Sequence, residues 1–349
     1  MTTSTTHIDG HEPARSVEEQ ATAIEELVRL SLAKAKEDGV AMDGRMLRQS
    51  HAKQHGLVYA VFTVRQNLPD RLSVGLFAEP KAYHAYVRYS NSEGPNVPDN
   101  EPQLRGMSIK VFGVPGDKLL EYEKQAVTHD FILVNHPVFP VRDAVDFLEF
   151  TRCLHEGKPQ KFFMGGINPA KWRLREMQIA RAYRARAVDN PLAIPYWSAT
   201  PYRYGKTSVK YGVTPALLVN VDKPDYDEHN YLRQAMLYTL YDQEVFLDFR
   251  VALRGESERM PIDDARVEWW PAETYTVAQI RIPRQRFDTP KRRLIGDNLA
   301  FNPWHCLPEH EPLGSLNKAR GKVYEALSVL RRETNGVVSE EPTAPEDMD

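Results

Sequence analysis

Near the C-terminus of this 349-residue chain stands the segment SLNKARGKVYEALSVLRRE, which covers residues 315–333. Its apolar residues recur at helical spacing and predict a helix from about Leu316 to Glu333 with one buried face. That face consists of Leu316, Val323, Leu327 and Leu330. Asn335-Gly336 follows as a stop signal, because glycine readily adopts the left-handed conformation that ends helices.

Two kinds of polar residue on this helix point to a function. Arg320 and Tyr324 are four residues apart, so the guanidinium lies one turn above the phenol, and Arg331 follows two turns later on roughly the same face. A nearby positive charge favours the ionised phenol over its reference pKa of about 10. A phenolate is a known axial ligand of ferric haem. The alternative is that Tyr324 is an ordinary core tyrosine and both arginines are solvated.

The composition is that of an ordinary globular protein, with 42% hydrophobic and 27% charged residues. The net charge is −3 and the basic residues are scattered, so nothing predicts a nucleic-acid partner. No apolar run approaches the roughly 18 residues of a membrane span, and the polar N-terminus does not resemble a secretory signal. Cys153 and Cys306 have neither zinc-site spacing nor a disulfide pattern. A cytoplasmic location is therefore expected.

We expect a single folded domain over residues 16–336. Residues 1–15 are predicted to form a disordered leader, and the acidic residues 337–349, which include two prolines, a disordered tail. Ser16-Val17-Glu18-Glu19 has the pattern of a capping box and predicts a helix to about Asp38.

The middle of the chain is dominated by short strand patterns. Segments rich in aromatic and β-branched residues predict strands at 58–64, 72–77, 84–90, 107–112, 129–134, 208–211, 245–252 and 275–282. Helical patterns cover 141–155, 171–187 and 230–241. Strands that follow one another without alternating helices favour a closed antiparallel sheet over a doubly wound one. The predicted fold class is therefore α+β, with an antiparallel β-barrel and flanking helices.

Several motifs precede the C-terminal helix in a fixed order. They are Arg48-Gln-Ser-His51-Ala-Lys-x-x-Gly56, Val87-Arg88-Tyr-Ser90, Arg105-Gly106-Met-x-Ile-Lys110, Asp130-Phe-Ile-Leu-Val-Asn135-x-Pro137-Val-Phe139 and Phe301-Asn302-Pro303. Each alone is weak, because a histidine at a strand entrance is usually a hydrogen-bonded loop residue. Together with the Arg320-x-x-x-Tyr324 pair, they resemble the haem catalase superfamily over residues 45–332.

The resemblance implies a role for each matching residue. His51 matches the distal histidine, which moves a proton between the two peroxide oxygens, and Ser90 matches the serine that orients it. Tyr324 matches the phenolate ligand of the iron in haem b, and Arg320 the arginine that supports it. The residues that match propionate-binding arginines are Arg48, Arg88 and Arg331. The haem is expected to lie buried between the barrel and the C-terminal helix.

The sequence departs from the family pattern at the distal site. Alignment on Pro137 and Phe139 places Val134 where the family has its distal asparagine, and Asn135 on the asparagine that follows. A shift of one residue would restore Asn135 to the site, although one residue along a strand means the opposite face. Asn135 is therefore retained as a candidate catalytic residue.

Two substitutions and the chain length also differ from full catalases. Pro140 replaces a phenylalanine, and Ser50 stands where catalases usually have valine. The given sequence ends 25 residues after Tyr324. We therefore expect the wrapping segment of full catalases to be missing or much reduced, and the C-terminal flavodoxin-like domain of the large forms to be absent. These features resemble the minimal, catalase-related proteins. A more open channel would admit bulkier hydroperoxides or an organic reductant.

The resemblance implies a haem-dependent peroxidase or catalase-like enzyme. It would cleave the O–O bond of hydrogen peroxide or an organic hydroperoxide through a ferryl intermediate, and Val134, Pro140 and the short C-terminus favour peroxidase over catalase. One alternative is a haem hydroperoxide isomerase or oxygenating enzyme in a biosynthetic pathway, which Ser50 mildly supports. Another is a non-enzymatic haem-binding protein, against which the presence of both His51 and Ser90 argues. The expected partners are a peroxide and a small organic reductant, and a homo-oligomer is left open.

Overall fold

The structure is a computed structural model, and it describes residues 15–41, 44–166, 168–183, 187–221, 223–337 and 341–345. Its strands are β1 (Gln54–Val64), β2 (Ala82–Asn91), β3 (Arg105–Phe112), β4 (Thr128–Val134), β5 (Tyr196–Trp197), β6 (Tyr202–Tyr204), β7 (Thr207–Pro215), β8 (Val245–Leu253) and β9 (Thr274–Ile282). Its helices are α1 (Val17–Asp38), α2 (Ala144–His155), α3 (Gln160–Phe163), α4 (Leu174–Tyr183), α5 (Tyr231–Asp242), α6 (Pro290–Asn298) and α7 (Ser315–Asn335).

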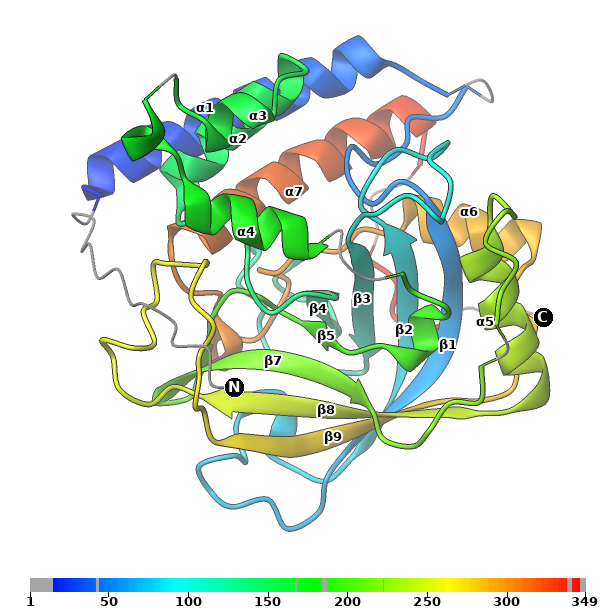
Figure 1. The fold of residues 1–349 in the computed structure, drawn as a ribbon. Coiled ribbons are helices and arrows are strands. Elements are labelled where there is room, and N and C mark those ends of the chain that lie inside the picture. Colours follow the sequence, from blue (N-terminus) through cyan, green and yellow to red (C-terminus); the bar gives the residue numbers. More distant parts are fainter. Residues whose placement is uncertain are drawn as a thin grey trace, which may run out of the picture.

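The central sheet is antiparallel throughout and closes on itself (Figure 1). The hydrogen-bonded order is β5-β4-β3-β2-β1-β9-β8-β7-β6, and a further pairing of β5 with β7 closes eight of these nine strands into a barrel, with β6 attached outside the ring. The two-residue strand β5 forms the seam, where Trp197 pairs with Val134 and Tyr196 with Val213. The predicted α+β fold with an antiparallel barrel and flanking helices is thus confirmed.

Aromatic side chains fill the barrel. The ring centroids of Phe131 and Phe249 are 4.7 Å apart, those of Phe62 and Phe249 are 5.2 Å apart, and Tyr211 packs edge-on against Phe131 at 5.1 Å. These four side chains belong to one buried core to which every long strand contributes. Because side chains alternate along a strand, the intervening residues of β1 to β4 face outward.

One predicted strand is wrong. Residues 72–77 form a bend and a 3-10 turn at Gly75–Phe77 instead of a strand. The turn uses a φ of +53° at Gly75, which suits glycine, and it buries Leu76 and Phe77 against the barrel core. A short apolar run signals burial but not the type of element that achieves it. The other predicted strands lie within β1 to β4 and β7 to β9.

The predicted helices also occur, with shifted ends. The helix predicted from residue 141 begins at Ala144, and the one predicted over 171–187 is α4, with residues 184–186 outside the described part of the chain. α7 is longer than predicted and ends at Gly336, whose φ of +64° is the left-handed cap. Among the helices described, none combines the length and the apolarity that crossing a lipid bilayer requires.

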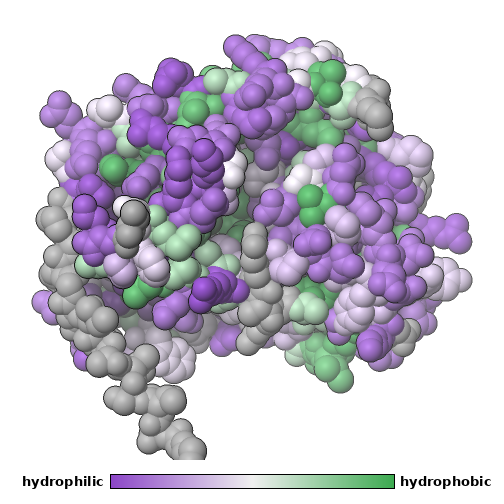
Figure 2. Space-filling view, turned by 45° about the horizontal axis from the view of Figure 1, so that its top comes forward, coloured by the Kyte–Doolittle hydropathy of each residue, from purple (hydrophilic) through white to green (hydrophobic). Residues whose placement is uncertain are grey.

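A layer of three helices, α1, α2 and α7, covers one side of the barrel, and α5 and α6 lie beside β1 (Figure 1). The helices of this layer share a buried core that consists of Ala23, Leu27, Ala144, Leu148, Ala319 and Val323. The surface on this side is mostly hydrophilic, with hydrophobic residues in small separate areas (Figure 2). The apolar face of α7 is thus used for packing, as its sequence period predicts.

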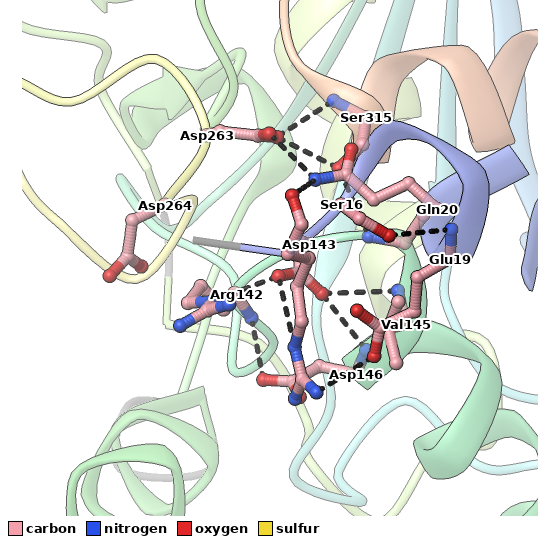
Figure 3. Close-up of polar contacts among 12 residues, drawn as sticks. Ser16, Glu19, Gln20, Arg142, Asp143, Val145, Asp146, Asp263, Asp264 and Ser315 are labelled. Carbon is pink, nitrogen blue, oxygen red and sulfur yellow. Dashed lines mark hydrogen bonds and ion pairs between the residues drawn. The ribbon is translucent and has the colours of Figure 1, made fainter. Parts of the chain in front are cut away.

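Acidic side chains tie together the N-termini of the three helices (Figure 3). Asp143 caps α2 by accepting two backbone N–H groups of its first turn at 3.0 and 3.1 Å. Asp263 accepts from both the backbone N–H and the hydroxyl of Ser315 at 2.8 Å and from Gln20 of α1 at 3.1 Å. The Ser315 hydroxyl in turn accepts the N–H of Ala144 at 3.3 Å. These bonds fix the start of the helix that carries Tyr324.

The predicted leader and tail lie largely outside the described residues. Within the predicted tail, however, Glu341 has a side chain only 7% exposed. It accepts a hydrogen bond from the Thr128 hydroxyl at 2.7 Å and pairs with Lys110, whose ammonium also lies 2.7 Å from Asp130. This part of the predicted tail therefore contacts the outer face of β3 and β4.

Candidate active site

α7 brings Arg320 and Tyr324 together as the helical spacing predicts. The Arg320 guanidinium carbon lies 5.7 Å from the centroid of the Tyr324 ring, and its Nη1 donates to Thr200 Oγ1 at 2.9 Å and to Asn317 Oδ1 at 3.0 Å. Burial alone would lower the pKa of Arg320, but the phenols of Tyr324 and Tyr202 beside it raise that pKa above its ordinary value. Arg320 is therefore a fixed, permanent positive charge next to the Tyr324 phenol.

His51 and Ser90 also meet. The Nδ1 atom of His51 lies 3.0 Å from the Ser90 hydroxyl oxygen, although the two residues come from a loop and from the end of β2. The backbone of His51 has a φ of +59°, in the left-handed region, and its N–H donates to the Ser92 carbonyl at 3.3 Å. Burial, with repulsion from Arg88 and Arg48, lowers the pKa of His51 to about 3. The imidazole is thus neutral near pH 7.

The ring of His51 lies against two residues, Ser90 and Gly106, of a row of three on the outer face of the barrel. Ser90 of β2 pairs with Gly106 of β3, and Gly106 pairs with Val134 of β4. A Cβ atom at Gly106 would lie 2.5 Å from His51 Nδ1 and 2.9 Å from the Ser90 hydroxyl, so only glycine leaves room for the ring. The sequence motif contained Gly106, but no role for it was predicted.

Asn135 is not brought together with His51. Its Oδ1 accepts the backbone N–H of Arg105 at 2.8 Å, and its own N–H donates to the Arg105 carbonyl at 3.0 Å. Val134, the last residue of β4, faces outward opposite Gly106, and Asn135 follows the end of the strand.

The predicted propionate-binding arginines form a cluster of positive charge in which Arg88 and Arg331 are buried and Arg48 is half-buried. Arg48 donates to three main-chain carbonyls at residues 296–299, and Arg88 donates to the carbonyls of Gly296 at 3.1 Å and His51 at 2.9 Å. Arg331 is 5% exposed, and within the described residues its Nε atom has no hydrogen-bond partner. Burial and then mutual repulsion hold the pKa values of Arg48 and Arg331 well below the ordinary range, and burial lowers that of Arg88 to about 10.

These residues fit haem b. Among the described residues, none of these three guanidinium groups forms an ion pair, and the charge of Asp297 nearby is the one negative charge that acts on all three. One carboxylate is less than three buried or half-buried positive charges normally require. The two propionates of a haem would supply the remaining negative charge, through charge-assisted hydrogen bonds to Arg48, Arg88 and Arg331. Tyr324, beside the fixed charge of Arg320, is the candidate iron ligand.

A second buried network supports His51 from the inner face of the sheet. Asp99 accepts from Lys53 Nζ and Asn91 Nδ2, both at 2.8 Å, and Asn91 Oδ1 accepts from Arg105 at 2.5 Å and His55 at 2.7 Å. All five side chains are at most 7% exposed. Lys53, Asn91 and Arg105 lie within two residues of His51, Ser90 and Gly106 in the sequence. The network therefore ties the loop that carries His51 to β2 and β3.

This network was missed at the level of sequence, although a signal was present. Asn91 and Arg105 follow Ser90 and precede Gly106, so strand alternation places both on the inner, mostly apolar face of the barrel. A polar residue at such a position requires a buried partner. The partner, Asp99, lies in a loop whose position no periodicity reveals.

Replacing Gly106 by alanine should displace the imidazole. The new methyl group would overlap His51 and Ser90, so we expect a loss of about 1–3 kcal/mol in the free energy of unfolding and a broken hydrogen bond between them. The control is Gly212→Ala, because a Cβ atom there meets nothing closer than 3.7 Å. Denaturant unfolding of both variants measures the difference, and equal stability would contradict the placement of His51 over Gly106.

Protonation of buried histidines should make the fold acid-labile. Burial lowers the pKa values of His51 and His310 to about 3, of His55 to about 4, and of His129 well below its ordinary value. Near pH 5 the unfolded chain binds about four protons at these positions that the folded chain does not. Burial raises the pKa of Asp130 to about 6, so near pH 5 the folded chain binds one proton there that the unfolded chain does not. The net difference is about three protons.

Stability should therefore fall as pH decreases through 6.5, by about 4 kcal/mol per pH unit near pH 5, since three net protons are taken up on unfolding. Urea unfolding between pH 7 and 5 measures this slope. His51→Asn should reduce this slope by the contribution of about one proton. A stability that does not change over this range would show that the histidines are not held neutral.

Of the comparisons with known proteins, the one with solved structures supports the fold. No known family profile matches the sequence, and no curated protein matches it. Three solved structures are similar to the chain over nearly its whole length: a bacterial catalase (14% identity, TM-score 0.64), a fungal catalase (14%, 0.61) and catalase A from Saccharomyces cerevisiae (15%, 0.63). The similarity covers 98%, 100% and 100% of this chain, and 67%, 72% and 74% of those chains. This protein has the fold of the catalases.

Proposed function

We propose that the protein binds haem b and is a peroxidase that activates organic hydroperoxides more effectively than it dismutates hydrogen peroxide. The observation that carries this proposal is the neutral His51 imidazole, fixed by Ser90 over Gly106 and bordered by a buried surplus of arginines. A protein that merely carried haem would have no need of a positioned base. When bound, the haem would supply a ferric iron that exchanges electrons with the peroxide.

His51 would move the proton. If Nδ1 carries the hydrogen and donates it to Ser90, the free Nε2 atom is the base that accepts a proton from one peroxide oxygen and returns it to the other. Ser90 holds that tautomer and the orientation of the ring. Tyr324, with Arg320 against it, would hold the iron, and Arg48, Arg88 and Arg331 would neutralise the propionates.

The preference for organic hydroperoxides follows from Val134. Val134 is 7% exposed and lies beside Gly106. It presents methyl groups at the position where the distal asparagine of the family would present an amide that binds a second polar oxygen. An apolar wall favours an alkyl substituent on the peroxide and gives a bare hydrogen peroxide fewer partners.

Rearrangement of hydroperoxides has less support. Ser50, the residue that favoured an isomerase, is exposed, and its hydroxyl donates to the Ser92 carbonyl at 3.4 Å. Its hydroxyl is therefore engaged by the main chain just beyond β2.

Stopped-flow absorption of the haem-reconstituted protein tests the proposal. We expect fast spectral changes with cumene hydroperoxide, formation of the corresponding alcohol in the presence of an organic reductant, and little oxygen release from hydrogen peroxide. Vigorous oxygen release would identify a true catalase, and formation of a rearranged product without reductant an isomerase. No spectral change with any peroxide would contradict the proposal altogether.

A further inference from the structure

A separate pocket of about 250 Å³ adjoins the loop that carries Arg48 and His51. Its walls come from that loop, from the start of β1 and from α5 and α6, and they include Arg45, Lys53, Gln54, Arg233, Arg293 and Asp297. At about 30 Å³ for each water molecule, the pocket has room for a phosphate ion or a short dicarboxylate. None of the arginines assigned to the haem propionates lines it.

The walls carry more positive than negative charge. Arg233 and Arg293 share a single oxygen of Asp288, at 3.2 and 2.7 Å. The Lys53 ammonium is fully bonded behind the wall, to Asp99 at 2.8 Å and to the carbonyls of Val97 at 2.8 Å and His229 at 2.9 Å. Asp297 accepts from Gln54 at 2.7 Å and pairs with Arg45 at 3.3 Å, so its charge is already engaged. Arg233 and Lys53 are 19% and 7% exposed at their side chains, which keeps solvent from screening them fully.

The pKa shifts of these groups differ: the hydrogen bond to Asp288 raises the pKa of the more exposed Arg293, whereas those of Arg233 and Lys53 are lowered. Burial is the main reason why the pKa of Arg233 lies below its ordinary value. Repulsion from Arg293 adds to this effect, and the attraction of Asp288 opposes it. Burial also lowers the pKa of Lys53, and the nearby charges of Arg105 and Arg233 add to the effect despite the bond to Asp99. An anion bound here would relieve both effects.

We infer that this pocket binds a small oxyanion, a carboxylate or a phosphate, between the guanidinium groups of Arg233 and Arg293. A guanidinium presents a planar fork of donors, and the donors that Asp288 does not occupy would bind the oxygens of such a group. The inference does not depend on haem binding, because no residue proposed to hold the haem takes part.

Binding of an anion in this pocket would affect the neighbouring site around Arg48 and His51. The backbone carbonyl of Asp297 accepts from Arg48 at 2.8 Å, and Arg233 donates to the Gln54 carbonyl at 2.6 Å at the start of β1. The oxyanion would therefore neutralise a charged wall on the segment that positions Arg48 and His51.

Isothermal titration calorimetry of the full-length protein tests the inference. Inorganic phosphate and succinate are titrated at constant ionic strength into haem-loaded and haem-free protein, and we expect one saturable site with a Kd below about 1 mM for at least one of them. Which anion binds more tightly distinguishes a phosphate site from a carboxylate site. Absence of saturable binding by both anions would overturn the inference, whatever the haem-loaded protein does with peroxides.

Arg233→Gln and Arg293→Gln should each weaken binding about tenfold or more, because each removes a charge-assisted contact. Arg293 is 51% exposed, so its replacement leaves the fold intact and decides the matter if the Arg233 variant is unstable. Arg259→Gln is the matched control, since that guanidinium is 70% exposed and absent from the pocket. An unchanged Kd in Arg293→Gln would show that the anion binds elsewhere.

Discussion

Tyr324→Phe is expected to abolish stable haem binding. The substitution removes one oxygen atom, the only ligand that α7 offers at this position, and leaves the aromatic ring and its packing in place. Changes to groups that merely support a metal ligand typically cost 10- to 100-fold in affinity, so loss of the ligand itself should cost more than about 100-fold. Arg320 would remain held by Thr200 and Asn317.

Titration of haem-free protein with haemin, followed by absorption spectroscopy, measures this effect. Tyr202→Phe is the matched control, because Tyr202 also lies against Arg320 but is not the proposed ligand. Circular dichroism confirms that both variants are folded. If Tyr324→Phe binds haemin as tightly as the unmodified protein, the assignment of the iron ligand is wrong.

Replacing His51 should have the opposite pattern: haem is retained and peroxide reactivity is lost. General acid–base catalysis by a positioned side chain typically contributes about 10²- to 10⁴-fold, and we expect the rate constant for reaction with cumene hydroperoxide to fall by that factor. Because His51 has a φ of +59°, asparagine, which tolerates this region, serves beside alanine as a replacement without added backbone strain.

The matched control for His51 is its neighbour. Ser50→Ala alters an exposed hydroxyl on the same loop and should react normally. Ser90→Ala should show an intermediate loss, because the base remains but its ring is no longer oriented. Equal rates in the His51 variants and the unmodified protein would refute the proton-transfer role.

Local periodicity predicted much of this structure correctly. In β2 the alternation of Val87 and Tyr89 with Arg88 and Ser90 separates the barrel core from the outer face, as a two-residue period requires. The Arg320–Tyr324 pair follows in the same way from the helical period. Such features depend on neighbours within one element, and a sequence displays them directly.

Features that depend on contacts between distant segments were not predictable. Glycine is required at position 106 because the ring of His51 occupies the space of a side chain there. Glu341 is buried because it pairs with Lys110 and accepts a hydrogen bond from Thr128. No local pattern encodes either contact. The prediction of a strand at 72–77 was wrong for a related reason. A buried turn and a buried strand both require a short apolar run in the sequence, so the run does not distinguish them.

The closure of the barrel has a consequence for synthesis. Val61 of β1 pairs with His84 on one side and with Arg281 of β9 on the other, so one edge of β1 stays open until the ribosome has made most of the chain. At about 5–20 residues per second, this wait lasts on the order of ten seconds or more. An uncovered strand edge recruits strands of other chains. The nascent protein should therefore depend on chaperones that shield this edge, and its yield on how quickly translation supplies β9.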